Sequence, residues 1–332
     1  MAMASEAGVS ASVDTQLDEL PPAAGGTPPR PSPRELPYRV VSSKVRLGVR
    51  VREIWESREL FVFLVRKELK VKYKSSVLGL LWSMLNPAVV LMVYYVVFKY
   101  VLKNPTPDFA LYLFSGLLVW NLFATVLPGS SSTIVANAGI VKKVAFPREI
   151  LPLSQVGTGV VFLFFQMIVM ALFLLGFQYS PDWSYLPVAL FALVDLIVLT
   201  AAFAIFLSAV NVYYRDVEHL VAVLLQAWFW GIPVVYNFNL VYTELVKLHS
   251  FHWLMDLYLI DPVTPLVLAF QRAFYGHVDV AVPSQAHYQV LAGYSAGFYL
   301  EMLLAVLVAG VLLLVGAMKV FGRIEGNFAE EL

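Results

Sequence analysis

The feature that most limits how this chain can fold is a set of long segments without charge. Residues 76–98, 109–136 and 150–177 are strongly apolar and contain no Asp, Glu, Lys or Arg. About 20 apolar residues in a helix span the roughly 30 Å hydrocarbon core of a bilayer. Three more segments are almost as apolar, with Asp195 and Glu301 as their only charged residues: 185–214, 220–243 and 298–318. The sequence therefore predicts an all-α integral membrane protein with six transmembrane helices.

The composition agrees with a membrane protein and removes several kinds of site. Hydrophobic residues make up 59% of the chain, against about 45–50% in soluble domains. There is no cysteine, which excludes disulfides, thiolate metal sites and cysteine nucleophiles. The chain also lacks the G-x-x-x-x-G-K-S/T, H-E-x-x-H and G-x-S-x-G motifs. We expect no catalytic, metal or cofactor site in this chain, and no nucleic acid among its partners.

Lysine and arginine are distributed unequally between the two ends of the apolar segments. Nineteen of the 23 lie on the side that holds both termini and the 137–149 loop, and four lie on the other side. Cytoplasmic loops of membrane proteins carry the excess of positive charge. This pattern predicts a multi-pass protein of the cytoplasmic membrane with both termini in the cytoplasm.

The segments outside the spans differ from one another. Residues 1–50 are rich in Pro and Ala and are predicted to be a disordered cytoplasmic tail. Residues 51–74 repeat apolar side chains at helical spacing among charged ones, which predicts an amphipathic helix in the membrane interface. Residues 75–325 form the predicted six-span transmembrane domain, and 326–332 a short cytoplasmic C-terminal end.

The stretch 244–297, on the side opposite the termini, is too polar to span and too apolar for an ordinary loop. Pro262 and Pro265 interrupt it, as Pro233 is expected to kink the fifth span or end it early. Two short re-entrant helices fit this pattern, since backbone that turns back inside a membrane is tolerated where protein or water covers it. A seventh span is the competing interpretation, but it would place the C-terminus outside.

The loop VKKVAFPREILP, residues 141–152, displays charges between two apolar spans. Lys142, Lys143 and Arg148 keep this loop on the cytoplasmic side. The loop is long enough to form a short helix, unlike the tight turn between the fourth and fifth spans. Because Arg148 and Glu149 should lie outside the bilayer, reversing their charges is expected to leave the spans folded.

Two other sets of residues are candidates for function. The cytoplasmic turn holds Arg215, Asp216 and Glu218. A membrane enzyme such as a polytopic glycosyltransferase would need convergent carboxylates there, but the adjacent arginine favours an ordinary loop structure. Four aromatic residues on the first and fifth spans could offer stacking surfaces to sugar rings, with helix packing as the alternative: Tyr94, Tyr95, Trp228 and Tyr236.

Asp195 is the one carboxylate well inside a predicted span. Acidic residues within a membrane are costly and tend to be functional. A hydrogen bond to a neighbouring helix is an equally good explanation, and one isolated acid does not make a proton relay.

Four motifs in order resemble ABC-2 type permeases that export polysaccharides. RKELKVKYKSSVLGLLWSMLNP (66–87) resembles the entry to their first span, and VKKVAFPREILPLS (141–154) their first cytoplasmic loop. NVYYRDVEHLV (211–221) resembles the turn between their fourth and fifth spans, and IDPVTPLVLAFQRAFYG (260–276) their outer segment. The nearest members of the family are the Wzm-like permeases of O-antigen and galactan export, with teichoic acid and capsule exporters close by.

The resemblance implies a subunit of a transporter in the bacterial inner membrane and not an enzyme. The family implies a homodimer with two copies of a separate ABC ATPase subunit, which binds ATP and Mg. It implies an interface helix at 52–74, a coupling helix in 137–150 and outer gate helices within 244–290. The loop that docks on the ATPase would contain Lys142, Lys143, Phe146, Pro147, Arg148 and Glu149. The substrate would be a polysaccharide on a polyprenyl diphosphate lipid, of galactan or O-antigen type.

An ABC-2 type exporter of drugs or small lipids shares this architecture and is the alternative. The amphipathic segment at 52–74 and the YRD sequence at 214–216 favour the polysaccharide exporter. The proline-rich tail departs from the family pattern, and we assign it no role.

Overall fold

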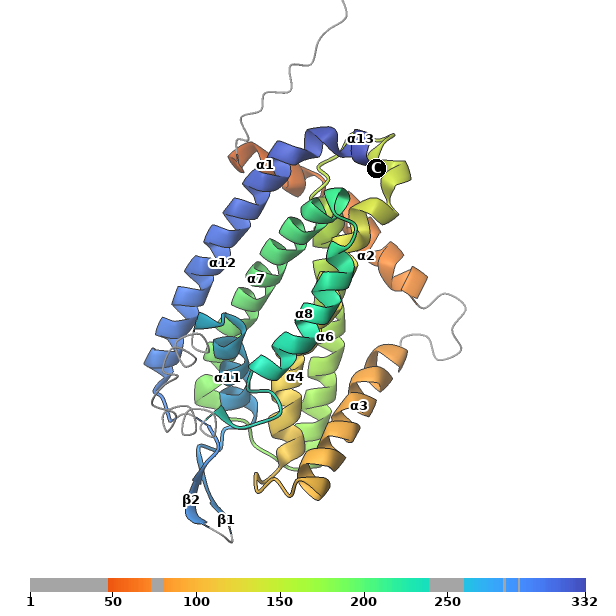
Figure 1. Ribbon diagram of the computed structural model, residues 1–332. Helices are drawn as coiled ribbons and strands as arrows, with labels where there is room; N and C mark the ends of the chain where they lie inside the picture. Colours follow the sequence, from red (N-terminus) through yellow and green to blue (C-terminus); the bar gives the residue numbers. More distant parts are fainter. Residues whose placement is uncertain (1–46, 73–80, 239–259, 283–284, 292) are drawn as a thin grey trace, which may run out of the picture. The chain divides into compact units, whose positions relative to one another are not determined.

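Apolar helices dominate the part of the chain that the computed structural model describes, which is residues 47–72, 81–238, 260–282, 285–291 and 293–332 (Figure 1). These residues belong to one unit, Ser43–Leu332. Its elements in chain order are α1 (Leu47–Glu56), α2 (Arg58–Lys72), α3 (Leu81–Tyr95), η1 (Val96–Val101), α4 (Phe109–Ala136), α5 (Ala138–Val141), α6 (Ile150–Gly176), η2 (Trp183–Tyr185), α7 (Leu186–Tyr213), α8 (Val217–Gly231), α11 (Val263–Phe274), β1 (Asp279–Val282), β2 (Gln285–Gln289), α12 (Ala296–Ile324), η3 (Glu325–Asn327) and α13 (Phe328–Glu331).

Four of these helical segments are long and apolar enough to cross a membrane: α4, α6, η2 with α7, and α12 with η3. They correspond to the predicted second, third, fourth and sixth spans. The structure therefore supports a multi-pass membrane protein.

The helices at the first and fifth positions are shorter within the described residues. The π-helical η1 extends α3, so that this helix runs from Leu81 to Val101. Helix α8 has 15 residues and ends at Gly231, where Ile232 takes an extended backbone conformation. Proline disfavours helical backbone in the residue before it, so Pro233 ends the helix early, as expected. The part of the predicted fifth span from residue 239 onward lies outside the described residues.

Helix α4 lies at the centre and packs against α6, α7, α8 and α11. The two helices α4 and α6 are close at Gly159, where an added Cβ would lie 2.3 Å from Val126 Cγ2 and 2.8 Å from Leu122 Cδ1. Small residues allow such close helix contacts in membranes. Two helical turns further along the same interface, Asn121 Nδ2 donates to Gln166 Oε1 at 3.1 Å. The close packing at Gly159 and this hydrogen bond thus hold α4 against α6.

The segment before α12 contains a helix and, in addition to the predicted helical fold, a β-hairpin. Helix α11 is buried along nearly its whole length. Its 12 residues are too few to cross a bilayer, which fits a re-entrant helix. Gly276 follows α11 with a φ of 74°, a conformation that favours glycine. The chain then forms the antiparallel pair β1–β2. A second re-entrant helix would fall largely on 239–259, outside the described residues.

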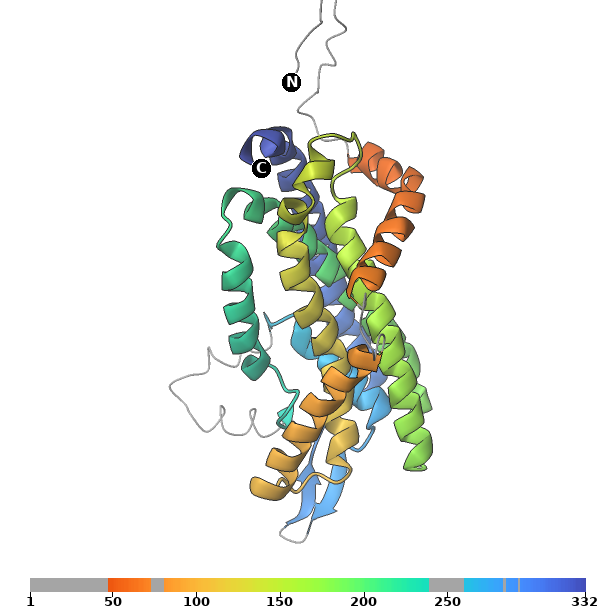
Figure 2. The ribbon, with the colours of Figure 1, turned by 90° about the vertical axis from the view of Figure 1, so that its right-hand side faces the viewer.

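The predicted amphipathic helix is two helices, α1 and α2, with a turn at Ser57. Helix α2 packs along α6 (Figure 2). The contact is close at Gly157, where an added Cβ would lie 2.7 Å from Phe61 Cζ and 2.9 Å from Val65 Cγ2. Helix α1 begins at Leu47, so the predicted tail boundary at residue 50 falls inside a helix. The tail up to residue 46 lies outside the described residues.

Candidate functional site

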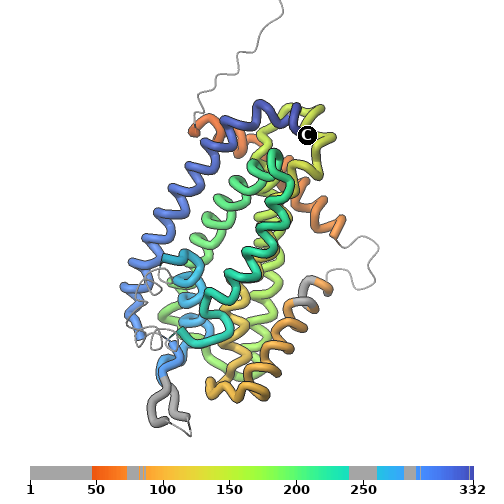
Figure 3. The backbone as a smooth tube through the Cα atoms, viewed as in Figure 1, coloured from red at the N-terminus to blue at the C-terminus, as the bar shows by residue number. Residues whose placement is uncertain are grey.

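The loop between α4 and α6 lies at the end of the unit where α1 and the C-terminal segment also lie (Figure 3). We call this the terminal end. Helix α4 stops at Asn137, whose Nδ2 donates to Thr133 O at 2.8 Å. Asn137 Oδ1 accepts from Lys67 Nζ of α2 at 3.0 Å. The predicted coupling helix is reduced to the four residues of α5, so most of residues 137–150 is irregular loop.

The tip of this loop is exposed, whereas its base, residues 146–149, is half-buried or buried. Residues 142–145, which include Lys142 and Lys143, are all exposed. Phe146 and Pro147 are half-buried, and Val141 on the other side of the tip is buried. The tip therefore presents two ammonium groups together with the exposed apolar side chain of Val144. It is the part of the loop that is free to contact another molecule.

Arg148 and Glu149 contact segments of their own chain. Glu149 is 0% exposed, and its Oε1 lies 3.4 Å from Arg50 Nη1 of α1, an ion pair without hydrogen-bond geometry. Arg148 Nη1 donates to the backbone carbonyl of Glu325. Both side chains were expected to lie outside the bilayer, and the structure adds that Glu149 is buried beside Arg50 of α1.

Burial governs the charge state of Glu149. Removing this carboxylate from water raises its pKa above the ordinary value, because the charged form loses hydration. The nearby guanidinium of Arg50 acts in the opposite direction, with a smaller effect on the pKa. Arg50 also pairs with the carboxylate of Glu325. One arginine of α1 thus joins the start of α6 to the end of α12.

The second predicted cytoplasmic site, the turn between α7 and α8, is exposed. Arg215 and Asp216 are exposed, and Glu218 is half-buried. The backbone N–H of Glu218 donates to Asn211 Oδ1 at 3.1 Å, which fixes the start of α8 against the end of α7. The two carboxylates do not enclose a buried site, and this geometry agrees with a structural turn.

The four predicted aromatic residues do not form one surface. Tyr94 of α3 stacks on Phe229 of α8 with ring centroids 5.6 Å apart. Trp228, also of α8, packs against α4 and α7 and donates its Nε1–H to Asp261 Oδ1 at 2.8 Å. The hydroxyl of Tyr236 donates to the carbonyl of Trp230 at 2.9 Å. Tyr94, Trp228 and Tyr236 therefore take part in packing, or in hydrogen bonds within the chain.

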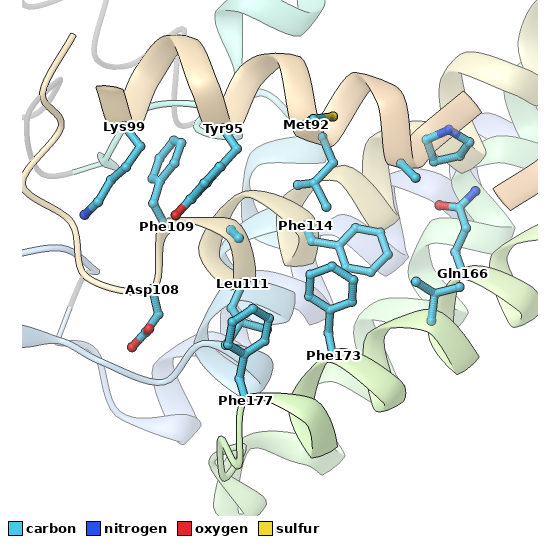
Figure 4. A pocket seen from close by; sticks show the side chains of 15 residues that line it. Met92, Tyr95, Lys99, Asp108, Phe109, Leu111, Phe114, Gln166, Phe173 and Phe177 are labelled. Atoms are coloured by element: carbon cyan, nitrogen blue, oxygen red, sulfur yellow. The ribbon is translucent and has the colours of Figure 1, made fainter. Parts of the chain in front are cut away.

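Tyr95 lies on another face of α3, where it lines a cavity of about 510 Å³ between α3, α4 and α6 (Figure 4). Met92, Phe114 and Phe173 form its apolar middle. Lys99 and Asp108 lie near one end, and Gln166 lies near the other (Figure 4). Sequence reasoning missed this cavity, since its walls come from three helices whose packing no local pattern shows.

Asp195 in α7 is 1% exposed, and its carboxylate oxygens have no hydrogen-bond partner among the described residues. The predicted bond to a neighbouring helix is therefore not found in this part of the chain. The described residues also contain no group of three His, Cys, Asp or Glu that could hold a metal ion.

The long apolar helices and the short, buried α11 are those of a multi-pass membrane protein. The chain belongs to the ABC-2 type transporter family, whose model matches residues 59–275. It is 33% identical over 284 residues to the O-antigen export system permease protein RfbA of Myxococcus xanthus. That match covers 85% of this chain and 98% of the relative. A Klebsiella pneumoniae protein of the same name is 30% identical over 277 residues, covering 82% of this chain and 95% of that protein.

Proposed function

We propose that this chain is the transmembrane permease subunit of an ATP-driven ABC exporter. Its substrate would be a polyprenyl-diphosphate-linked polysaccharide of galactan or O-antigen type, moved across the bacterial inner membrane. The observation that carries this proposal is the similarity to O-antigen export permeases over 82–85% of the chain. The helical order and the re-entrant α11 support the same function.

ATP would bind to a separate ABC ATPase subunit, present in two copies, together with its Mg ion. The exposed tip at residues 142–145 supports docking of that subunit at the terminal end. Purified permease alone should therefore hydrolyse no ATP, and hydrolysis should appear when the ATPase subunit is added. Hydrolysis that persists in a rigorously ATPase-free preparation would contradict the proposal.

The proposed topology has six crossings and both termini in the cytoplasm. Because the chain contains no cysteine, single cysteines can report which side of the membrane a residue faces. Ile140 of α5 is 42% exposed, and Asp279 of β1 is also exposed. In intact cells, a membrane-impermeant thiol reagent should label a cysteine at residue 279 and leave one at residue 140 unlabelled. The reverse pattern would reject the topology.

We also propose a homodimer, because a glycan of many sugars needs a wider path than the helices of one subunit would enclose. Large apolar side chains on α3 and α8 are exposed in the single chain, which supports contact of these helices with a second copy. They are Trp82, Leu85, Val89, Met92, Val93, Leu220, Val223, Leu224 and Trp230. Of the four aromatic residues proposed to line the path, Tyr95 gives the clearest alanine test, because it lines the cavity and its ring contact, with Tyr100, is to the next turn of the same helical segment.

The decisive experiment depletes the protein in its own cells and analyses the membrane lipids. A lipid-linked glycan should accumulate on the cytoplasmic side and disappear when the wild-type chain is restored. A permease with both Lys142→Glu and Lys143→Glu should restore export poorly, and the cysteine label at residue 140 checks that its loop still faces the cytoplasm. Normal glycan export with new sensitivity to toxic compounds would instead support the drug or small-lipid exporter.

A further inference from the structure

The C-terminal segment after α12 folds back into the protein. Phe328 is 0% exposed. Its ring centroid lies 5.4 Å from that of Phe321 in α12 and 6.3 Å from that of Tyr213 at the end of α7. The hydroxyl of Tyr213 donates to the carbonyl of Ile324 at 3.0 Å. These contacts hold residues 325–332, which we call the C-terminal segment, against two membrane-crossing helices.

Arg148 links this segment to the base of the loop between α4 and α6. Its Nη1 donates to the carbonyl of Glu325, 177 residues further along the chain. Its guanidinium also lies over the ring of Phe328, 5.8 Å from the ring centroid, within the range of cation–π attraction. A charge that the sequence placed on a partner-facing loop is therefore used inside the fold.

Arg50 of α1 supplies a second link between the base of this loop and the C-terminal segment. It pairs with Glu149 at the base of the loop and with the side chain of Glu325. The loop base is thus held from both sides, by α1 and by the C-terminal segment, while residues 142–145 at the tip remain exposed. An exposed tip on a fixed base can pass a displacement to α6, which begins at Ile150.

We propose that the C-terminal segment is a positioning element for the partner-facing loop, with Phe328 as its anchor and Arg148 as its link to the loop. This inference rests on the proposed function. With the base fixed, motion of the ATPase subunit at the tip is transmitted to α6 and, through the C-terminal segment, to α12. With the base released, the tip still binds the partner but moves independently of the spans. ATP hydrolysis then continues without export.

The test uses the complete permease–ATPase complex in proteoliposomes with its glycolipid substrate. Phe328→Ala removes the anchor, and Arg148→Lys keeps the positive charge but loses the planar guanidinium. Three quantities are measured: ATPase recovered with the permease, the rate of ATP hydrolysis, and glycan exported per ATP hydrolysed. Both variants should assemble at wild-type levels, while glycan exported per ATP falls by about 5-fold or more, the size of a typical coupling between sites.

Glu331→Gln is the matched control, since this residue lies in the same segment with an exposed side chain. It should leave glycan exported per ATP unchanged. Phe328→Tyr, which keeps an aromatic ring, should restore most of the coupling. If Phe328→Ala prevents folding, Arg148→Lys alone decides the question.

Two results would overturn the inference. One is wild-type export per ATP in an assembled Arg148→Lys complex. The other is loss of assembly in that variant, which would make Arg148 a docking residue. A wild-type complex that exports no glycolipid would instead refute the proposed function, so the two failures can be told apart.

Discussion

Trp228 of α8 donates its indole Nε1–H to Asp261 Oδ1 at 2.8 Å, and this bond joins α8 to the start of the buried helix α11. The other carboxylate oxygen of Asp261 accepts from the backbone N–H of Thr264 at 2.8 Å and from its hydroxyl at 2.7 Å. Asp261 therefore accepts hydrogen bonds from the first turn of α11 and connects this helix to α8. Trp228, which was proposed from the sequence to line a glycan path, thus has a hydrogen-bond partner within the fold.

Trp228→Phe should remove that bond and keep most of the ring packing. Leaving one oxygen of a half-buried carboxylate without its donor should cost about 1 kcal/mol of folding free energy. Thermal denaturation of the purified protein in detergent measures the loss. Trp230→Phe is the control on the same helix, because Trp230 is 52% exposed, and its midpoint should barely change. Equal midpoints for both variants would mean that the bond contributes nothing.

Glu149→Lys should destabilise the protein, contrary to the expectation from sequence. The new cation would be buried near Arg50 and Arg148, and an uncompensated buried charge typically costs about 3–5 kcal/mol. Glu149→Gln should be tolerated, because Arg50 retains its partner Glu325. Yield and thermal midpoint of the two variants provide the comparison. A Lys variant as stable as the Gln variant would show that Glu149 is open to water.

The burial of Glu149 should also make the stability of the folded protein depend on pH. The folded-state pKa of Glu149 is raised by burial, so the folded protein holds a proton where the unfolded chain has released it. The stability from this proton is full below the unfolded pKa of about 4.3 and is lost as pH rises through the folded pKa. The wild type should therefore lose stability relative to Glu149→Gln over that window. A difference in midpoint that does not vary with pH would reject the raised pKa.

Gly159→Ala should separate α4 from α6. Its Cβ would lie 2.3 Å from Val126 Cγ2, and overpacking of this kind costs about 1–3 kcal/mol. Gly176→Ala on the same helix meets nothing within 4 Å and should be neutral or slightly stabilising. Thermal midpoints distinguish the two variants, and equal values would mean that Val126 and Leu122 move aside freely.

Arg272 and Asp182 should be energetically coupled. Arg272 Nη1 lies 2.8 Å from Asp182 Oδ2, and the guanidinium stacks 3.9 Å from the ring centroid of Tyr185. In a double-mutant cycle of alanine variants, we expect a coupling of about 0.5–3 kcal/mol, as for contacting residues in one network. The Arg52–Glu56 pair on α1 is highly exposed on both sides and should show no measurable coupling. Similar values for the two pairs would contradict this role.

Several features could be predicted from the sequence because their causes are local. A long apolar stretch satisfies its backbone in a bilayer by forming a helix, and α4, α6, α7 and α12 follow from that requirement. Pro233 ends α8 through a steric effect on the residue before it. The exposed pair Lys142 and Lys143 also follows from the local charge pattern.

The tertiary structure decided what the remaining charges contact. Arg50 and Glu149 are 99 positions apart, and Arg148 and Glu325 are 177 apart. No local pattern pairs such residues. In the sequence, Arg148 and Glu149 have the pattern of charges in a loop outside the membrane. In the structure, Arg148 contacts the C-terminal segment and Glu149 pairs with Arg50 of α1. The cavity beside Tyr95 arises in the same way, since its walls come from α3, α4 and α6. The long helices could be predicted from the local sequence, whereas burial and ion pairing depend on which helices pack together.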